Sequence, residues 1–325
     1  MPDPFLGYLL AAGALLLFTL SILVAKVASS RIKLDLGFLI ATSVNVVFAA
    51  LALAVQLALR SDGIQWNAQA FWLFAAAGGF STYLGRWFFY ESVVRFGPAK
   101  ASLFQVSSPL FTALIAWLML GERLTLPLGA GILMAVGGLV LVSYKPDAGN
   151  PGGAKLRSLM RRGSVALAAS AAARPSARDR LLQSVLLLGL GSSLAYAISN
   201  VLRGIAVRGW NEPILGALAG AVAGLALHLA FSKGKQQLLA RLRQASRTGI
   251  WLYALMGVCT IAAQMCLIGS MRYIPVSVAA LMTLCTPVLV FPLSHWLFKG
   301  QYPVTTATLA GGALTLVGMA IIVTR

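Results

Sequence analysis

The chain has 325 residues, of which 59% are hydrophobic and 10% are charged, and it carries a formal net charge of +18. A soluble domain contains about 25% charged residues, so this composition excludes an ordinary soluble protein. The basic residues lie in short loops between apolar runs, where membrane lipids are the expected partners. No aromatic-basic recognition motif accompanies them, so we expect no nucleic acid as a partner.

Ten uncharged runs follow one another along the chain. Each has about 20 residues or more, the length that a helix needs to cross about 30 Å of hydrocarbon. The runs show no strand-like alternation, and an open strand would leave its backbone without partners in lipid. The runs cover 4–25, 36–59, 63–85, 101–121, 124–144, 181–202, 213–232, 248–271, 273–298 and 300–324. We therefore predict an all-α integral membrane protein with ten transmembrane helices.

The ten runs form two repeats of five. Lys26 and Asp35 recur as Arg203 and Glu212 at the same separation, and the Arg-Phe-Gly-Pro segment at 95–98 recurs with the same displacement as Arg-Tyr-Ile-Pro. A unit that crosses the bilayer five times ends on the side opposite its start, so the second copy is predicted to be inverted. The predicted units are a first five-helix repeat over 1–144, a basic hydrophilic linker over 145–180 and a second repeat over 181–325.

Basic residues are unevenly distributed between the two predicted sides. They are concentrated in the loops after odd-numbered runs, including the linker 145–180, whereas the opposite side has fewer, among them Arg60, Arg123 and Arg203. The positive-inside rule then predicts that both termini lie outside the cytoplasm of a bacterial inner membrane.

Glycines at helical spacing predict close contacts between helices. Gly216, Gly220 and Gly224 form a stripe in the seventh run, and the glycine pairs 137–138 and 311–312 lie in the fifth and tenth runs. Small residues at such positions let helices approach closely within a membrane.

The third run carries polar residues, which are costly in lipid and are expected to face a cavity or another helix. Tyr83, Arg86 and Tyr90 lie on one helical stripe. Arg86 lies well inside the run, and a guanidinium binds a carboxylate through two parallel hydrogen bonds. We predict that Arg86 binds an anionic or carboxylate-bearing substrate. The alternative is a contact with backbone carbonyls or a side chain that snorkels to the interface.

Glu91 is the carboxylate that we expect to be buried in the bilayer, which makes it the candidate for proton coupling. The simpler interpretation is a local ion pair with Arg95, one helical turn further on.

Polar residues in four further runs are expected to complete the binding site. The fourth and ninth runs each carry hydroxyls around a proline, Pro109 or Pro287, and a proline within a helix frees a carbonyl and bends the helix. We predict kinks or gates at these two prolines. The sixth run has a stripe that includes Tyr196, Asn200 and Arg203. The predicted substrate contacts outside the third run are Gln105, Ser108, Asn200, Gln264, Thr283 and Thr286.

The sequence lacks catalytic and metal-binding motifs. It has no HExxH, Walker loop, G-x-S-x-G or paired carboxylates, and its 8 acidic residues and 3 cysteines form no metal-ligand set. We therefore expect no enzymatic activity, no metal and no cofactor.

Three segments of the first half form a signature. They are Gly-Pro-Ala-Lys-Ala at 97–101, Ser-Pro-Leu-Phe at 108–111 and Ala-Trp-Leu-Met-Leu-Gly-Glu-Arg-Leu at 116–124. In the second half Pro275, Pro287 and Gly300 fit the same pattern, but Gln301 stands where the first repeat has Glu122. These residues resemble the EamA-type signature of the drug/metabolite transporter superfamily.

The resemblance implies a ten-helix, inverted-repeat permease that works without ATP or a bound cofactor. Bacterial members of that superfamily export amino acids and other metabolites, and they have cytoplasmic termini, contrary to the charge distribution here. We predict a secondary transporter that exports small metabolites by alternating access. Two alternatives remain open, namely a flippase for lipid-linked substrates and a membrane scaffold that transports nothing.

Overall fold

The structure is a computed structural model that describes residues 4–32, 34–60, 63–89, 107–122, 125–143, 185–231, 242, 244–297 and 306–323. Within these ranges every regular element is a helix, so the predicted all-α class is confirmed. The linker 145–180 lies outside the described residues.

The helices of the first repeat follow the predicted runs. They are α1 (Pro4–Ser29), α2 (Leu34–Leu59), α3 (Ala68–Gly78) with the π-helix η1 (Gly79–Gly85), α6 (Ser108–Leu120) and α7 (Leu126–Ser143). α3 begins later than its predicted run because Asn67 caps it, with the Asn67 side-chain oxygen accepting a hydrogen bond from the Ala70 N–H at 3.0 Å.

The helices of the second repeat follow their runs as well. They are α10 (Val185–Gly209), α11 (Pro213–Phe231), α13 (Arg247–Ser270), α14 (Val276–Leu284), α15 (Thr286–Leu297) and α16 (Thr306–Val323). The ninth predicted run is interrupted at Cys285, between α14 and α15 and two residues before Pro287. The interruption lies close to the proline at which a kink or gate is predicted, and that role of Pro287 stays a prediction.

Pro109 lies in the first turn of α6, which begins at Ser108. A proline at this position fits the helix, because the N–H that it lacks would have no partner within the helix anyway. The residues before Ser107 lie outside the described ranges, so the kink or gate predicted at Pro109 stays a prediction.

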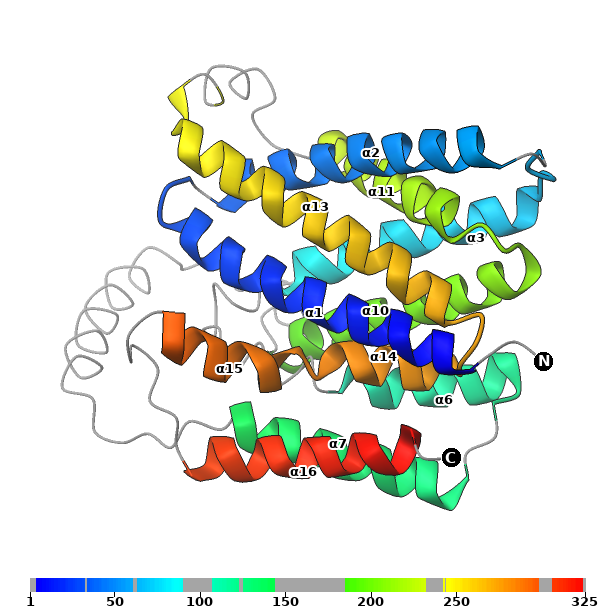
Figure 1. Cartoon of the computed structure of the whole chain (residues 1–325), viewed down its shortest axis with the longest axis vertical. Coiled ribbons are helices and arrows are strands. Elements are labelled where there is room, and N and C mark those ends of the chain that lie inside the picture. The colour runs from blue at the N-terminus through cyan, green and yellow to red at the C-terminus, as the bar shows by residue number, and fades with distance from the viewer. Residues whose placement is uncertain are drawn as a thin grey trace, which may run out of the picture.

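Five of the described helices, α1, α2, α10, α11 and α13, are long and apolar enough to cross a membrane. Large apolar side chains are exposed on the helices, including Phe5 at 72% and Leu126 at 91%, as expected for surfaces that face lipid. Figure 1 shows α1 beginning and α16 ending at the same side of the molecule, on the right. We call this the terminal side, and the opposite side, toward which α7 ends and α10 begins, the linker side.

The two repeats exchange packing partners. By position within the repeats, α1 corresponds to α10, and α3 with η1 corresponds to α13. α1 packs chiefly against α13, and α10 packs chiefly against α3 and η1. α2 packs against its own counterpart α11, and α7 packs against its counterpart α16. Each repeat therefore completes its packing with helices of the other, so the contact between the repeats forms the centre of the molecule.

The predicted glycine stripe of α11 lies against α3. A side chain on Gly216 would meet the ring of Phe74 at 2.6 Å, and Gly220 lies against the backbone of Gly78. A Cβ on Gly78 would lie 2.1 Å from the carbonyl oxygen of Gly220. The two helices are thus in backbone contact, which confirms the packing role predicted for the stripe.

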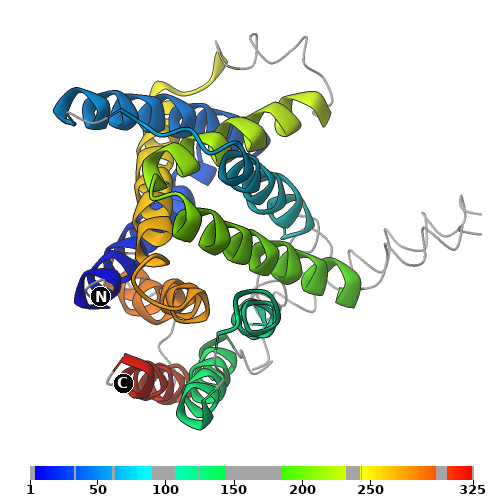
Figure 2. The same ribbon diagram turned by 90° about the vertical axis from the view of Figure 1, so that its right-hand side faces the viewer.

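Helices α7 and α16 form a pair at the edge of the molecule, and both contact each other far more than they contact any other helix. Figure 2 shows the pair below the remaining helices. A Cβ on Gly138 would lie 2.4 Å from the carbonyl oxygen of Gly311, whereas Gly137 and Gly312 have room for one. One glycine of each predicted pair therefore makes the close contact.

Candidate functional site

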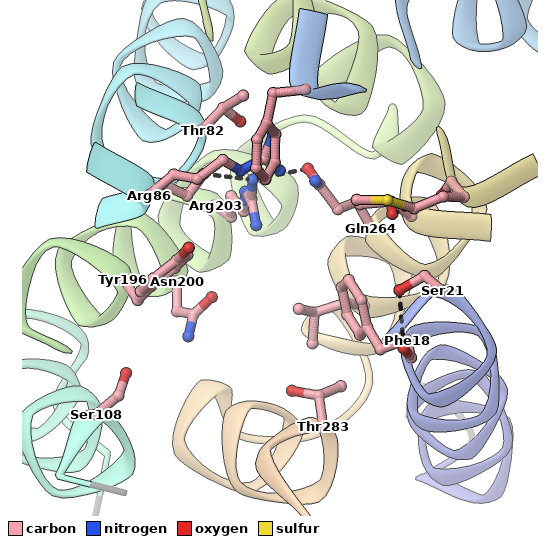
Figure 3. Close-up of a pocket in the computed structure, with 15 residues that line it drawn as sticks. Phe18, Ser21, Thr82, Arg86, Ser108, Tyr196, Asn200, Arg203, Gln264 and Thr283 are labelled. Atoms are coloured by element: carbon pink, nitrogen blue, oxygen red, sulfur yellow. Dashed lines mark hydrogen bonds between the residues drawn. The ribbon is translucent and has the colours of Figure 1, made fainter. Parts of the chain in front are cut away.

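A cavity of about 280 Å³ lies where the two repeats meet (Figure 3). The first repeat contributes residues of α1, α2, η1 and α6, together with Arg86, and the second contributes residues of α10, α13 and α14. The lining residues are Phe18, Ser21, Phe38, Ser81, Thr82, Arg86, Ser108, Tyr196, Asn200, Arg203, Met256, Thr260, Gln264, Leu267 and Thr283.

Arg86, the residue predicted to bind substrate, lines the cavity, and η1 determines its direction. It follows η1 directly, and π-helical turns are rare and are found frequently at functional sites. The Arg86 guanidinium carbon lies 4.9 Å from the centre of the Phe38 ring, and its Nη1 lies 3.5 Å from the Thr42 hydroxyl. Among the described residues no carboxylate pairs with Arg86, so its charge is available to a bound solute.

Arg203 is a second guanidinium in the cavity, and the sequence analysis was wrong to place it in a loop. α10 continues to Gly209, so Arg203 lies inside the helix with 5% of its surface exposed. Its Nη2 donates to the Ser81 hydroxyl at 3.0 Å and to the Gln264 side-chain oxygen at 2.9 Å. Both acceptors are neutral, so these hydrogen bonds hold the guanidinium in place without balancing its charge.

The start of α6 forms another wall of the cavity. Ser108 is fully buried, and its hydroxyl has no hydrogen-bond partner among the described residues. Figure 3 shows this hydroxyl and the Asn200 amide directed into the space between the helices. Thr283 lies on the α14 side, and its hydroxyl donates to the Ala280 carbonyl at 2.9 Å. Among the described lining residues, Ser108 and Asn200 are therefore two neutral groups with hydrogen-bonding capacity left for a solute.

The predicted contacts separate into three groups. Arg86, Ser108, Asn200, Gln264 and Thr283 line the cavity. Tyr83 does not, because its ring stacks on Phe231 at 5.4 Å between centres. Thr286 does not either, and its buried hydroxyl donates to the Thr283 carbonyl. Tyr90, Glu91 and Gln105 lie outside the described residues.

Several lining residues had no place in the predicted site. Tyr196 and Arg203 lay on the same stripe as Asn200, and this spacing was the signal that could have included them. Ser81 and Thr82 gave no such signal, because hydroxyls in membrane helices often bond to their own backbone, as Ser81 does to the Ala77 carbonyl at 3.0 Å.

On the terminal side, Glu122 ties the two repeats together. It follows α6, and its carboxylate accepts hydrogen bonds from the Val276 N–H at 2.7 Å and from the Ser277 hydroxyl at 2.8 Å. It thereby caps the N-terminus of α14, where the helix dipole favours a negative charge. Arg208, near the end of α10, donates to the same carboxylate at 3.0 Å.

A second tie on this side involves Glu212, which is 4% exposed between α10 and α11. Arg60 forms an ion pair with it, and the Gln56 amide donates to it at 3.4 Å. The Trp210 indole N–H donates to the Gln65 carbonyl at 2.8 Å nearby. Each of these contacts joins a residue of the first repeat to one of the second.

Apolar packing fills the space between these ties and the cavity. Phe74, Val207 and Met271 are almost fully buried in the central core cluster, and Val207 and Met271 lie beyond Arg203 and Gln264 toward the ends of their helices. Buried apolar side chains therefore lie between the cavity and the two ion pairs of the terminal side. Within the same ranges no three His, Cys, Asp or Glu side chains cluster as metal ligands.

Comparison with known proteins adds the family and the fold. The sequence pattern of the EamA-like transporter family matches residues 5–144 and 183–324, so both predicted repeats are matched separately. No curated protein matches the sequence significantly. A solved structure described only as "Crystal structure of protein" is similar with a TM-score of 0.68 and 19% identity, over 97% of this chain and 96% of that one. At this identity the likeness concerns the fold alone.

Proposed function

Because the chain belongs to the EamA-like transporter family, we propose that it is a secondary transporter that moves small metabolites through the central cavity. The observation that carries this proposal is the position of the cavity, which is lined by polar residues of both repeats. Transporters built from two inverted repeats bind their substrates at such an interface. Amino acids and related compounds are of a size that suits a cavity of about 280 Å³.

The mechanism proposed is alternating access between two inverted five-helix repeats, with ten transmembrane helices in all. The exchange of packing partners between α1 and α10 supports an internal two-fold relationship, because each makes the counterpart of the contact that the other makes. In this mechanism the contacts of Glu122 and Glu212 across the two repeats keep the terminal side closed in one of the two states. In the alternate state these ties are broken, and the cavity opens on the terminal side.

We further propose a location in a bacterial inner membrane and transport in the direction of export. The basic linker joins the end of α7 to the start of α10, and both of these helix ends lie on the linker side. If the positive-inside rule applies to this chain, the linker side is cytoplasmic, and the closed terminal side faces outward. A solute would then enter the cavity from the cytoplasm and leave when the terminal side opens.

Efflux from a bacterial host that overexpresses the chain tests this proposal. The cells are challenged with amino acids, their analogues and cationic toxicants, and we expect selective resistance and efflux that Arg86→Ala abolishes at equal membrane abundance. Arg31→Ala is the matched control, because Arg31 is an exposed arginine in the turn between α1 and α2. Unchanged efflux in Arg86→Ala would remove Arg86 from the pathway. Absence of protein-dependent efflux for every solute would contradict the transport function itself.

A further inference from the structure

We infer that the cavity binds a small organic anion whose carboxylate or phosphate group is held by Arg86, Arg203 and the start of α6 at Ser108. The inference rests on the proposed function, because it names the substrate class of the same cavity. It goes beyond that function in adding two groups, Arg203 and Ser108, to the binding of the charged end of the solute.

The first argument is the charge of the cavity. Two of its lining side chains are guanidinium groups, and none of the described lining residues is an aspartate or a glutamate. Arg203 is 5% exposed, and its hydrogen-bond acceptors Ser81 and Gln264 are neutral. A buried charge without a counter-charge is strongly unfavourable in a protein interior. A bound anion would supply the missing charge, whereas a cation would add to the repulsion.

The second argument is the start of α6. The N-terminus of a helix carries a partial positive charge and presents N–H groups that suit an anion. α6 has 13 residues, and its first residue, Ser108, lines the cavity. The Ser108 hydroxyl is fully buried without a hydrogen-bond partner in the described part of the chain. A buried hydroxyl without a partner destabilises the protein unless a solute forms a hydrogen bond with it. Figure 3 shows this hydroxyl directed into the cavity.

The third argument is the arrangement of the groups. Figure 3 shows Arg86 and Arg203 close together at one end of the cavity, with the Asn200 amide between that end and Ser108. An anionic group bound there would have two cations on one side and neutral donors on the other. The remaining walls include Phe18, Met256 and other apolar side chains, so the rest of the solute is expected to be short and partly apolar.

Ligand-dependent thermal stability of the purified full chain in lipid nanodiscs tests this inference. The probes are L-lactate, L-malate and glycerol 3-phosphate as sodium salts, each against its neutral counterpart, lactamide, malamide or glycerol, and choline serves as the cation. A ligand that binds the folded state raises Tm in proportion to the logarithm of its concentration above Kd. We expect at least one anion to raise Tm where its neutral counterpart and choline do not. The carboxylate and phosphate arms distinguish the two kinds of anionic group.

Two variants assign the effect to the site. Arg203→Gln is expected to weaken anion binding about tenfold or more, since it removes a charged hydrogen-bond donor. Arg203→Lys keeps the charge and is expected to retain more of the affinity. Ser108→Ala is expected to weaken binding several-fold while leaving the Tm of the free protein unchanged or higher, because it removes an unpaired hydroxyl. The control is Ser199→Ala, a buried serine outside the cavity whose hydroxyl donates to the Ala77 carbonyl; its anion affinity should equal that of the wild type.

The contradicting outcomes are distinct from failure of the transport proposal. If choline or the neutral solutes raise Tm as much as the anions, or if no anion raises it, the anion assignment is wrong, whereas protein-dependent efflux of another solute would still support transport. If an anion binds equally well to Arg203→Gln and Ser108→Ala, it binds elsewhere, and the assigned site is wrong.

Discussion

At the scale of single residues, Arg203 is the unusual feature of the molecule. Its guanidinium is held by the Ser81 hydroxyl and the Gln264 side-chain oxygen, both within 3.0 Å, and neither of them balances its charge. A carboxylate in place of the Gln264 amide would balance the charge of Arg203 and stabilise the protein. The same carboxylate would take the place of an anionic substrate, so stability and substrate binding favour different side chains at this position.

Gln264→Glu is predicted to raise the stability of the protein and to lower its affinity for anions. The new carboxylate should pair with Arg203 and raise the free energy of unfolding by about 1.5–3 kcal/mol, the range of hydrogen bonds to charged groups. The same change should lower the affinity for anions about tenfold or more, because the new carboxylate neutralises one of the two positive charges of the cavity and repels an anion. Thermal unfolding with and without the anion measures both effects on one sample.

The matched control for this prediction is Gln264→Met, which removes the acceptor without adding a charge. It should lower Tm, because the buried Arg203 loses one of its two hydrogen-bond acceptors. If Gln264→Glu binds the anion as tightly as the wild type, the charge of the cavity does not determine its selectivity.

At the scale of elements, backbone contact between α3 and α11 holds the wall of the cavity. The contact point is Gly78 against Gly220, one turn before Ser81 on the same continuous helix. Any displacement of α3 at this point would move η1 and therefore Arg86. Packing between these helices is thus part of what positions the site.

Gly78→Ala is predicted to destabilise the protein, because the new Cβ would lie 2.1 Å from the Gly220 carbonyl oxygen and neither backbone has room to move. Overpacking of this kind costs about 1–3 kcal/mol. Gly137→Ala is the matched control, since its nearest neighbour outside the helix would be the Leu314 side chain at 3.9 Å. That variant should leave Tm unchanged or raise it, because alanine favours a helix by up to about 1 kcal/mol over glycine. Equal Tm values for the two variants would show that the α3–α11 contact is not tight.

At the scale of the whole molecule, the two repeats are joined on the terminal side by charged groups that water could also solvate. Glu122 connects α6 of the first repeat with α10 and the start of α14 of the second. Opening exposes the charged groups to water, and their hydration compensates part of the lost ion pairs, whereas apolar groups gain no such compensation. This property suits a side that opens and closes during transport.

Glu122→Gln is predicted to favour opening of the terminal side, because it removes the ion pair with Arg208 and weakens the cap on α14. Loss of hydrogen bonds to a charged group corresponds to about 1–3 kcal/mol, enough to increase the open population at least several-fold. The readout is the labelling rate of Met271→Cys by a membrane-impermeant thiol reagent, since Met271 is fully buried behind the seal.

The labelling requires a background in which the three native cysteines, Cys259, Cys266 and Cys285, are replaced by alanine. Arg31→Gln in the same background is the control, because it removes an exposed charge from the linker side. A labelling rate that Glu122→Gln leaves unchanged would exclude this carboxylate as part of the closure.

The sequence by itself determined the helices, the repeat and the close packing of α11. A bilayer leaves no alternative to helices for long apolar runs, and each predicted run contains a helix among the described residues. Glycine spacing predicted the face of α11 that contacts α3, because only small residues allow backbone contact. These features depend on local composition, which the sequence contains in full.

Only the tertiary structure decided which polar residues meet. Tyr83 and Arg86 lie on one stripe when the helix has its usual period, but η1 has wider, π-helical turns, so Arg86 reaches the cavity while Tyr83 stacks on Phe231. Arg203 has the sequence signature of a residue at the end of a span, and its burial follows from η1 and α13, which supply Ser81 and Gln264. The direction of a side chain depends on neighbours distant in sequence, and for this reason the fold could be predicted more completely than the site.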